Sequence, residues 1–313
     1  MLASPDADRA RAALRGRRLL YLAARGSSDN AATYAKYLFE SRGVVAALAA
    51  PSLFTLYRTP PDLRTAGVIG ISQSGAAPDV AAVVRVARRA GAPTVAVTNA
   101  LRSTLARAAR YVVRLEAGPE RSVAATKTFT STCLALARLA GAPVAGAPAA
   151  LEAALALRAD AERLARAIRG DALAVVGRGY AYPIALEVAL KIKELARVWA
   201  EPYSAADYAH GPIALAGRGA SVLILAARGP TLPGLRALAR ALRRRGTRVL
   251  ALTDDAALAD ASDDAVLVAG GAAEHLAALA LVVPGQLLAR ALALARGRDP
   301  DRLPDMRKVT RTR

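Results

Sequence analysis

Three charged residues, Glu187, Lys191 and Glu194, follow one another at spacings of four and three residues. On a helix, those spacings place all three side chains on one face. The flanking residues 183–186 and 188–190 are apolar, so this helix has little polar surface on which to expose charge. The alternative is a solvated ion pair, which would stabilise the helix by only about 0.3–0.5 kcal/mol. The apolar context favours a chemical role.

Lysine is rare in this chain: the 44 basic residues comprise 39 arginines and only five lysines, at positions 36, 127, 191, 193 and 308. A lysine amine differs from a guanidinium because it can lose a proton and form a Schiff base with a carbonyl. Lys191 and Lys308 are therefore better candidates for chemistry than any arginine. His210 lies in a predicted loop, where an imidazole can titrate near neutral pH and move protons. We expect His275 on a helix surface, with a structural or solvated role.

Two loops rich in hydroxyl groups follow apolar runs in the first half, at residues 26–30 (GSSDN) and 72–75 (SQSG). The second loop leads into a helix with Pro78 and Asp79 in its first turn, a favoured place for both. Hydroxyls and backbone N–H groups at a helix N-terminus suit a phosphate, although an ordinary Ser/Gly turn is the alternative. The corresponding loop of the second half, 226–229 (AARG), lacks both serines. That asymmetry favours a specific anion site.

The elements that position these residues alternate along the chain. Short apolar runs separated by segments of helical period predict a parallel sheet with helices on both faces. These runs lie at residues 18–24, 67–72, 93–99, 111–117, 171–177, 221–227, 248–254 and 264–270. Gly26, Gly75 and Thr98 recur as Gly179, Gly229 and Thr253, at offsets of 153 to 155 residues. We therefore predict two copies of one α/β sandwich, in domains 1–150 and 151–298, with a separate tail at 299–313.

The composition indicates which kinds of partner the protein is expected to bind. A formal net charge of +19 suits nucleic acid, but the arginines are scattered over both halves, so we expect no nucleic-acid partner. One cysteine, Cys133, excludes an internal disulfide, and two histidines are too few for a typical transition-metal site. We expect no metal and no cofactor. Charges or Pro284 interrupt every apolar stretch before membrane length, so we expect a cytoplasmic protein without membrane contact.

Several ordered motifs together resemble one family. The chain resembles double sugar-isomerase (SIS) domain proteins, most closely the isomerase half of glucosamine-6-phosphate synthase and its stand-alone relatives, the SIS-type glucosamine-6-phosphate deaminases and fructosamine-6-phosphate deglycases. The motifs are ARGSS (24–28), ISQSG (71–75), AGPERSVAATKTFT (117–130), GRG (177–179), PIALE (183–187), KIKE (191–194), HGP (210–212) and KVT (308–310). This resemblance implies two tandem flavodoxin-like SIS domains, each a five-stranded parallel sheet between helices, and a C-terminal tail that closes the active site.

The resemblance also implies a phosphate site in the first domain. The sugar phosphate would be held by Ser28, Ser72, Gln73 and Ser74, with backbone help near Val123.

The catalytic roles implied by the resemblance fall in the second domain and the tail. Glu194 would be the base that moves a proton between C1 and C2, Lys191 would assist it, and Glu187 would support both. His210 would open the sugar ring from the neighbouring subunit, which implies a homodimer. Lys308 would form an imine with the ketose carbonyl.

Three positions depart from the synthase pattern. Ala77 and Ala125 replace hydroxyl residues on the phosphate side, and Trp199 stands where the synthase has histidine. A glutaminase domain is also missing from this sequence, so we expect amine removal rather than amination.

The leading hypothesis is therefore conversion of glucosamine 6-phosphate to fructose 6-phosphate and ammonia. Deglycation of a fructosamine 6-phosphate, or aldose–ketose isomerisation, is the alternative. A sugar-phosphate sensor would not need the Glu187/Lys191/Glu194 set. A catalytically idle scaffold stays open because of Ala77.

Overall fold

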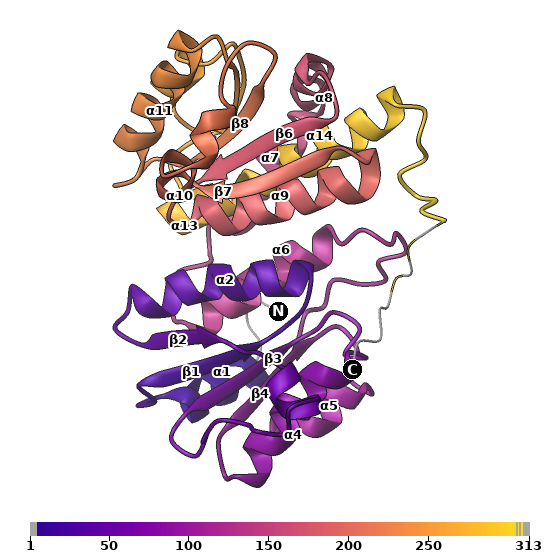
Figure 1. The fold of residues 1–313 in the computed structure, drawn as a ribbon. Helices are drawn as coiled ribbons and strands as arrows, with labels where there is room; N and C mark the ends of the chain where they lie inside the picture. Colours follow the sequence, from indigo (N-terminus) through magenta and orange to yellow (C-terminus); the bar gives the residue numbers. More distant parts are fainter. Residues whose placement is uncertain (1–4, 305, 307, 309–313) are drawn as a thin grey trace. The chain divides into compact units, whose positions relative to one another are not determined.

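The computed structural model describes residues 5–304, 306 and 308. The chain divides into two compact units: unit 1 is Met1–Val144 with Met306–Arg313, and unit 2 is Ala145–Asp305. Each unit holds one parallel five-stranded sheet with helices on both faces (Figure 1). The predicted fold class is confirmed. The domain limits at residues 150 and 298 stay predictions, and residues 306 and 308 group with unit 1 rather than standing apart.

The sheet of unit 1 has the strand order β2-β1-β3-β4-β5. Its strands are β1 (Leu19–Ala23), β2 (Val45–Leu48), β3 (Gly67–Ile71), β4 (Thr94–Thr98) and β5 (Tyr111–Arg114). The central strands β3 and β4 are buried along their whole length, as expected of parallel strands covered on both faces.

Helices cover both faces of that sheet. They are α1 (Pro5–Leu14), α2 (Ser27–Glu40), α3 (Ser52–Thr55), α4 (Pro78–Arg89), α5 (Thr104–Ala108) and α6 (Lys127–Leu139). Helix α6 packs against α1 and α2, whereas α4 packs against α3 and α5. Pro78 opens α4 and Asp79 lies in its first turn, as the sequence predicts.

Unit 2 repeats the topology with the order β10-β9-β8-β6-β7. Its strands are β6 (Ala172–Gly177), β7 (Trp199–Ser204), β8 (Ser221–Ala226), β9 (Arg248–Thr253) and β10 (Asp264–Leu267). Its helices are α7 (Ala147–Leu155), α8 (Arg158–Ala167), α9 (Ala181–Ala196), α10 (Ala205–Ala209), α11 (Leu232–Arg244), α12 (Ala256–Asp260), α13 (Glu274–Ala280) and α14 (Val282–Ala295), with a 3₁₀ turn, η1, at Pro212–Leu215.

This strand order determines where a ligand can enter each unit. In an open parallel sheet, ligands bind beyond the carboxyl ends of the strands where the strand order reverses. In unit 1 that point lies between β1 and β3. The two hydroxyl-rich loops, 26–30 and 72–75, follow these two strands. In unit 2 the equivalent point lies between β6 and β8, and β6 leads directly into α9.

The core of unit 2 is built around α14, which packs on α9 and α8. Gly285 permits the close approach to α9, because a Cβ there would lie 2.3 Å from Cγ2 of Val188. The stretch Glu274–Ala295, which joins α13 and α14, is long and apolar enough to cross a membrane by length and composition, although Pro284 and Arg290 interrupt it. Because 83% of its most apolar window is buried within the protein, this stretch is a core helix.

Candidate active site

The three charged residues of α9 form one cluster. The Nζ atom of Lys191 lies 3.5 Å from Oε1 of Glu187 and donates a hydrogen bond to Oε2 of Glu194. The side chains of Glu187 and Lys191 are 0% and 1% exposed, whereas that of Glu194 is 16% exposed. The solvated ion pair is therefore excluded. Only Glu194 reaches solvent, so it is the member of the cluster that a ligand could touch.

The local sequence explains why α9 buries charge. Gly177 ends β6, where a Cβ would lie 2.5 Å from the carbonyl oxygen of Ala181, so glycine lets the helix begin close to the strand. Eleven of its sixteen residues are buried, most of them apolar. The helix stops at Arg197, whose φ of 55° is left-handed. Burial of the charged pair is thus enforced by apolar neighbours on a rigid element.

The other two predicted catalytic residues lie in different units. His210 follows α10 in unit 2 and is exposed. Lys308 groups with unit 1, where its Nζ atom donates a hydrogen bond to the carbonyl oxygen of Ser122 and lies 3.7 Å from Oε2 of Glu120. The structure therefore brings Glu187, Lys191 and Glu194 together, and Lys308 to the loop before α6.

The predicted phosphate residues surround the carboxyl ends of β1 and β3. Ser28 lies in the first turn of α2, while Ser72, Gln73 and Ser74 follow β3. The hydroxyl of Ser72 accepts a hydrogen bond from the Gly75 N–H at 3.2 Å, so part of its capacity serves the turn itself.

A small cavity of about 20 Å³ lies beside these residues. It has room for about one water-sized group, such as one phosphate oxygen. Ser28 and Gln73 line it together with Ser27, Ala125, Thr128, Phe129 and Thr132. Ser74 instead lines a second, larger hollow. Val123, in the loop before α6, is half-buried and lines neither space among the described residues.

Glu120 is a buried carboxylate that the sequence analysis did not single out. Its side chain is 3% exposed. It accepts hydrogen bonds from the N–H and hydroxyl of Thr126 at 2.9 and 3.1 Å, and from the N–H and hydroxyl of Thr128. Burial alone would raise the pKa of this carboxyl, but the bonds from the two threonines and the Lys308 charge hold that pKa below its usual value. Glu120 therefore joins the loop before α6 to the tail.

A second unforeseen ion pair joins Arg25, after β1, to Asp79. The Nε atom of Arg25 lies 2.9 Å from Oδ2 of Asp79, whose side chain is 1% exposed. This pair holds the loop after β1 against the start of α4 and explains the acidic residue in the first turn of that helix.

The equivalent crevice of unit 2 is occupied by a carboxylate. A Cβ on Gly229 would lie 2.4 Å from Cδ of Glu274, and the Arg228 N–H donates to Oδ1 of Asp254 at 2.7 Å. Burial raises the pKa of both carboxyls, and for Glu274 the Asp254 charge adds to that shift. Carboxylates thus lie where unit 1 presents hydroxyls, so the crevice of unit 2 does not suit a phosphate.

His275 is buried, so the prediction that it lies on a helix surface is wrong. It lies in α13, where every residue from 275 to 280 is buried, and its ring packs 6.0 Å from that of Tyr180. Cys133 is a buried free thiol. Within residues 5–304, 306 and 308, no group of three or more His, Cys, Asp or Glu side chains could hold a metal ion.

Comparison with known proteins identifies the family. The SIS domain model matches the chain twice, at residues 13–142 and 169–296. The chain belongs to the SIS domain family. The two matches lie in the two sheet-bearing units, so each unit is one SIS domain.

Individual proteins are also similar in sequence to this chain. The chain is 36% identical over 260 residues to a glutamine–fructose-6-phosphate aminotransferase of Zymomonas mobilis, covering 76% of this chain and 43% of that protein. It spans about half the length of the proteins of the same name from Methanothermobacter thermautotrophicus and Pyrococcus horikoshii.

Among solved structures, the C-terminal domain of the Francisella tularensis glucosamine-fructose-6-phosphate aminotransferase superposes with a TM-score of 0.85 at 25% identity, over 94% of this chain and 88% of that one. A Thermotoga maritima glucosamine-6-phosphate deaminase superposes with a TM-score of 0.76 at 22% identity, over 98% and 97%. This second likeness shows the fold alone.

Proposed function

We propose that this SIS protein is an enzyme that converts glucosamine 6-phosphate to fructose 6-phosphate and ammonia. The observation that carries the proposal is the Glu187–Lys191–Glu194 cluster, in which two nearly inaccessible charges support one carboxylate that reaches solvent. A binding protein gains nothing from two charges that no ligand can touch. A catalyst gains a base of fixed position beside a fixed positive charge.

The reaction needs one proton transfer and one hydrolysis. In the open-chain aminosugar, Glu194 would take the proton from C2, the electrons of that C–H bond would form the C1–C2 double bond of an enolamine, and the aldehyde oxygen O1 would take up a proton from water. Return of the proton to C1 leaves an imine at C2. Water adds to that imine carbon, the C–N bond breaks, and ammonia leaves from fructose 6-phosphate. The ammonium group of Lys191, which donates a hydrogen bond to Oε2 of Glu194, would hold that carboxylate in position for the proton transfer.

The remaining residues would bind and prepare the sugar. Ser28, Ser72, Gln73 and Ser74, with the backbone at Val123, would hold the phosphate beyond β1 and β3. His210 would open the ring from the partner subunit of a homodimer.

Lys308 would form an imine with the ketose carbonyl, and the tail would close over the site to exclude water. Its present position beside Glu120 means that Lys308 must leave that carboxylate before it reacts. The proposal includes a cytoplasmic location, in line with the burial of the long apolar stretch Glu274–Ala295 within the protein.

Aldose–ketose isomerisation and deglycation are alternatives because they use the same C1–C2 proton transfer. The test is ammonia release from glucosamine 6-phosphate, measured beside isomerisation of glucose 6-phosphate and turnover of a fructosamine 6-phosphate. Ammonia release from the first substrate supports deamination. Turnover of only one of the other two would replace deamination by that reaction.

The variant Glu194→Gln tests the base. We expect a loss of at least about 10²-fold in kcat, the usual contribution of a general base, with sugar-phosphate binding preserved. The control Glu152→Gln, an exposed residue of α7, should leave kcat unchanged. Normal turnover by Glu194→Gln would remove Glu194 from the mechanism.

A further inference from the structure

Two adjoining hollows on unit 1 are lined by arginine. The first has a volume of about 570 Å³ and includes Arg102, Arg107 and Arg114; the second has about 530 Å³ and includes Arg85, Arg88 and Arg89. Both include Thr104 and Arg107, so they adjoin at these two residues. Each is within the size range of small-molecule sites, about 300–1,000 Å³.

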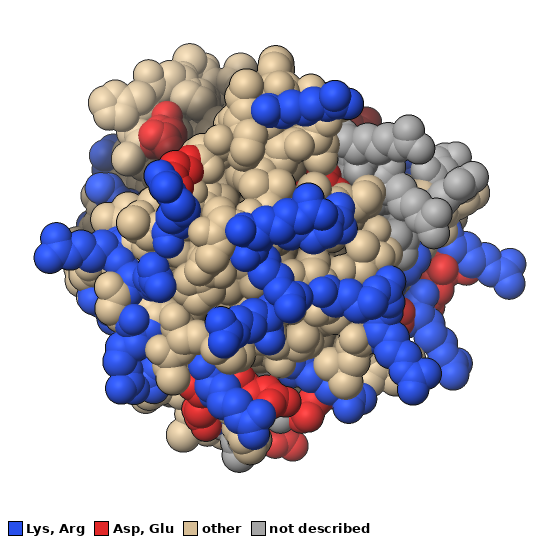
Figure 2. All heavy atoms as spheres, turned by 90° about the horizontal axis from the view of Figure 1, so that it is seen from below, with Lys and Arg blue, Asp and Glu red and all other residues tan. Residues whose placement is uncertain are grey.

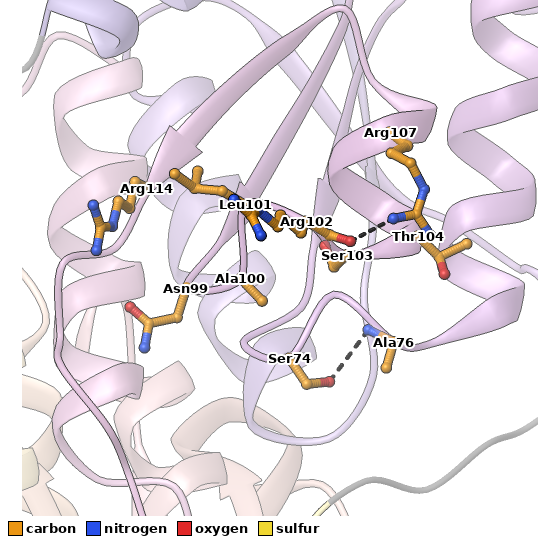
Figure 3. A pocket seen from close by; sticks show the side chains of 10 residues that line it. All are labelled: Ser74, Ala76, Asn99, Ala100, Leu101, Arg102, Ser103, Thr104, Arg107 and Arg114. Atoms are coloured by element: carbon orange, nitrogen blue, oxygen red, sulfur yellow. Dashed lines mark hydrogen bonds between the residues drawn. The ribbon is translucent and has the colours of Figure 1, made fainter.

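These arginines come from separate elements that converge on the hollows. Figure 3 shows Arg114 at the end of β5, Arg102 in the loop after β4 and Arg107 on α5. The other three lie on α4. Figure 2, viewed from the side of Figure 1 on which α4 lies, shows basic side chains spread over that face and fewer acidic ones.

Among the described residues, one carboxylate, that of Glu116, interacts electrostatically with an arginine of the hollows, Arg114. Neither hollow has Asp or Glu in its lining. In the described part of the chain, none of the six arginines lies within ion-pair distance of a carboxylate. The nearest acidic residue along the chain, Glu116, is exposed and outside both linings.

Two of the arginines support the local structure. Arg88 donates hydrogen bonds to the carbonyl oxygens of Arg107, Ala108 and Ala109 at 3.0–3.4 Å, which ties α4 to the end of α5. Arg107 donates one to the carbonyl oxygen of Arg102. These bonds hold the arginine-bearing segments in place before any ligand arrives.

The other polar residues of the lining could also bind phosphate oxygens. Ser74, Ser103, Thr104 and Asn99 add hydroxyl and amide groups to the first hollow. Arginine binds phosphate oxygens through two parallel N–H groups. A single phosphate would engage one side of Arg107 only, whereas a chain of phosphates could extend through both hollows. No aromatic side chain lines either one among the described residues, so bases of a nucleic acid find no stacking surface.

We propose that these hollows bind an oligophosphate, an anion with at least two linked phosphate groups such as inorganic tripolyphosphate or a nucleoside di- or triphosphate. The site is separate from the predicted sugar-phosphate cavity, although Ser74 lies in the loop that serves both. It therefore goes beyond the proposed function.

Isothermal titration calorimetry with inorganic tripolyphosphate tests the proposal, using the full-length protein at about 0.1 M salt. We expect one tripolyphosphate per chain, bound at least about tenfold more tightly than orthophosphate. Adenosine triphosphate forms a second arm: tighter binding than tripolyphosphate indicates that a nucleoside is also recognised, and equal binding indicates recognition of the phosphate chain alone. Either result supports the site. Binding of a DNA duplex without binding of tripolyphosphate would overturn it.

Charge-reversal variants locate the site. The pair Arg102→Glu and Arg107→Glu should weaken tripolyphosphate binding by at least about tenfold, because charge-assisted hydrogen bonds contribute that much. The matched control is Arg240→Glu with Arg244→Glu, two exposed arginines of α11 in unit 2, which changes the net charge equally. Equal weakening by both pairs would reduce the effect to net charge and overturn the proposal.

Further variants address two other outcomes, misfolding of the first pair and binding of tripolyphosphate at the sugar-phosphate site. If the Arg102/Arg107 pair does not fold, Arg85→Glu with Arg89→Glu tests the second hollow with the same expectation. Ser28→Ala, at a residue that lines the small cavity but neither hollow, should leave tripolyphosphate affinity unchanged; a loss would assign binding to the sugar-phosphate cavity and refute the new site. Because no assay here uses turnover, failure of the deaminase proposal would not affect the result.

Discussion

Removal of the buried lysine should destabilise unit 2 by several kcal/mol. In Lys191→Leu the helix receives an apolar side chain of good helix propensity, but the carboxylate of Glu187, at 0% exposure, loses its Lys191 partner. At the observed 3.5 Å, Coulomb's law with an effective dielectric constant of about 20 gives an attraction of roughly 5 kcal/mol. Measured losses on breaking buried pairs are about 3–5 kcal/mol, which is the range we expect.

The assay is urea unfolding followed by circular dichroism, with hydrogen exchange of peptides from α9 to assign the loss to unit 2. The double variant Glu187→Gln with Lys191→Leu should regain most of the lost stability, because it removes the buried carboxylate that has lost its Lys191 partner. The control Lys193→Met, two residues away and half-buried, should change stability by less than about 0.5 kcal/mol. A loss below about 1 kcal/mol in Lys191→Leu, or no recovery in the double variant, would refute the reasoning.

Two other carboxylates give opposite pH dependences. Because the folded-state pKa of Glu120 is lowered, the ionised carboxylate stabilises the folded protein above its ordinary pKa of about 4.5, and this stabilisation is lost as the pH falls through the folded value. Glu120→Gln should abolish that pH-dependent loss of stability. The same variant should reduce hydrogen-exchange protection near Thr126 at pH 7. The pKa of Glu274 is raised by burial and by Asp254, so its charge destabilises unit 2 at neutral pH, and stability recovers as the pH falls through that raised value. Glu274→Gln should therefore raise the melting temperature at pH 7 and have little effect near pH 4.

Sequence reasoning located the three central strands of each sheet and one of its two edge strands, β5 or β10. All eight predicted apolar runs contain strands, and the missed strands are β2 and β7, which lie at sheet edges. Edge strands are less buried, so their sequences need not be continuously apolar. Strand β2 has only four residues, of which Val45 and Leu48 are exposed, and β7 contains Pro202 and exposed Trp199. Only the resemblance to known proteins supplied the fifth strand of each sheet.

The candidate site likewise contains residues that the sequence predicted and residues that it did not. The helix period alone predicted the α9 cluster, because its three charges recur at fixed spacing among apolar residues. Glu120 could not be found that way. Its partners Thr126 and Thr128 lie within eight residues, but its contact with Lys308 spans 188 positions of sequence, and no local pattern encodes such a pair. His275 was misplaced because a polar residue next to Glu274 is typical of an exposed face, whereas contact with Tyr180 and apolar neighbours buries it.

The internal repeat shows that the buried charges are not a requirement of the fold. At the offset of 153 residues that aligns Gly26 with Gly179, Glu187 and Lys191 of α9 correspond to Tyr34 and Leu38 of α2. All four side chains are at most 1% exposed. The same helix position in the same topology is therefore filled by uncharged side chains in one SIS domain and by an ion pair in the other. Replacing a buried ion pair by packed apolar groups is often neutral or stabilising, so packing does not explain the pair. The proposed proton transfer at Glu194 would explain it.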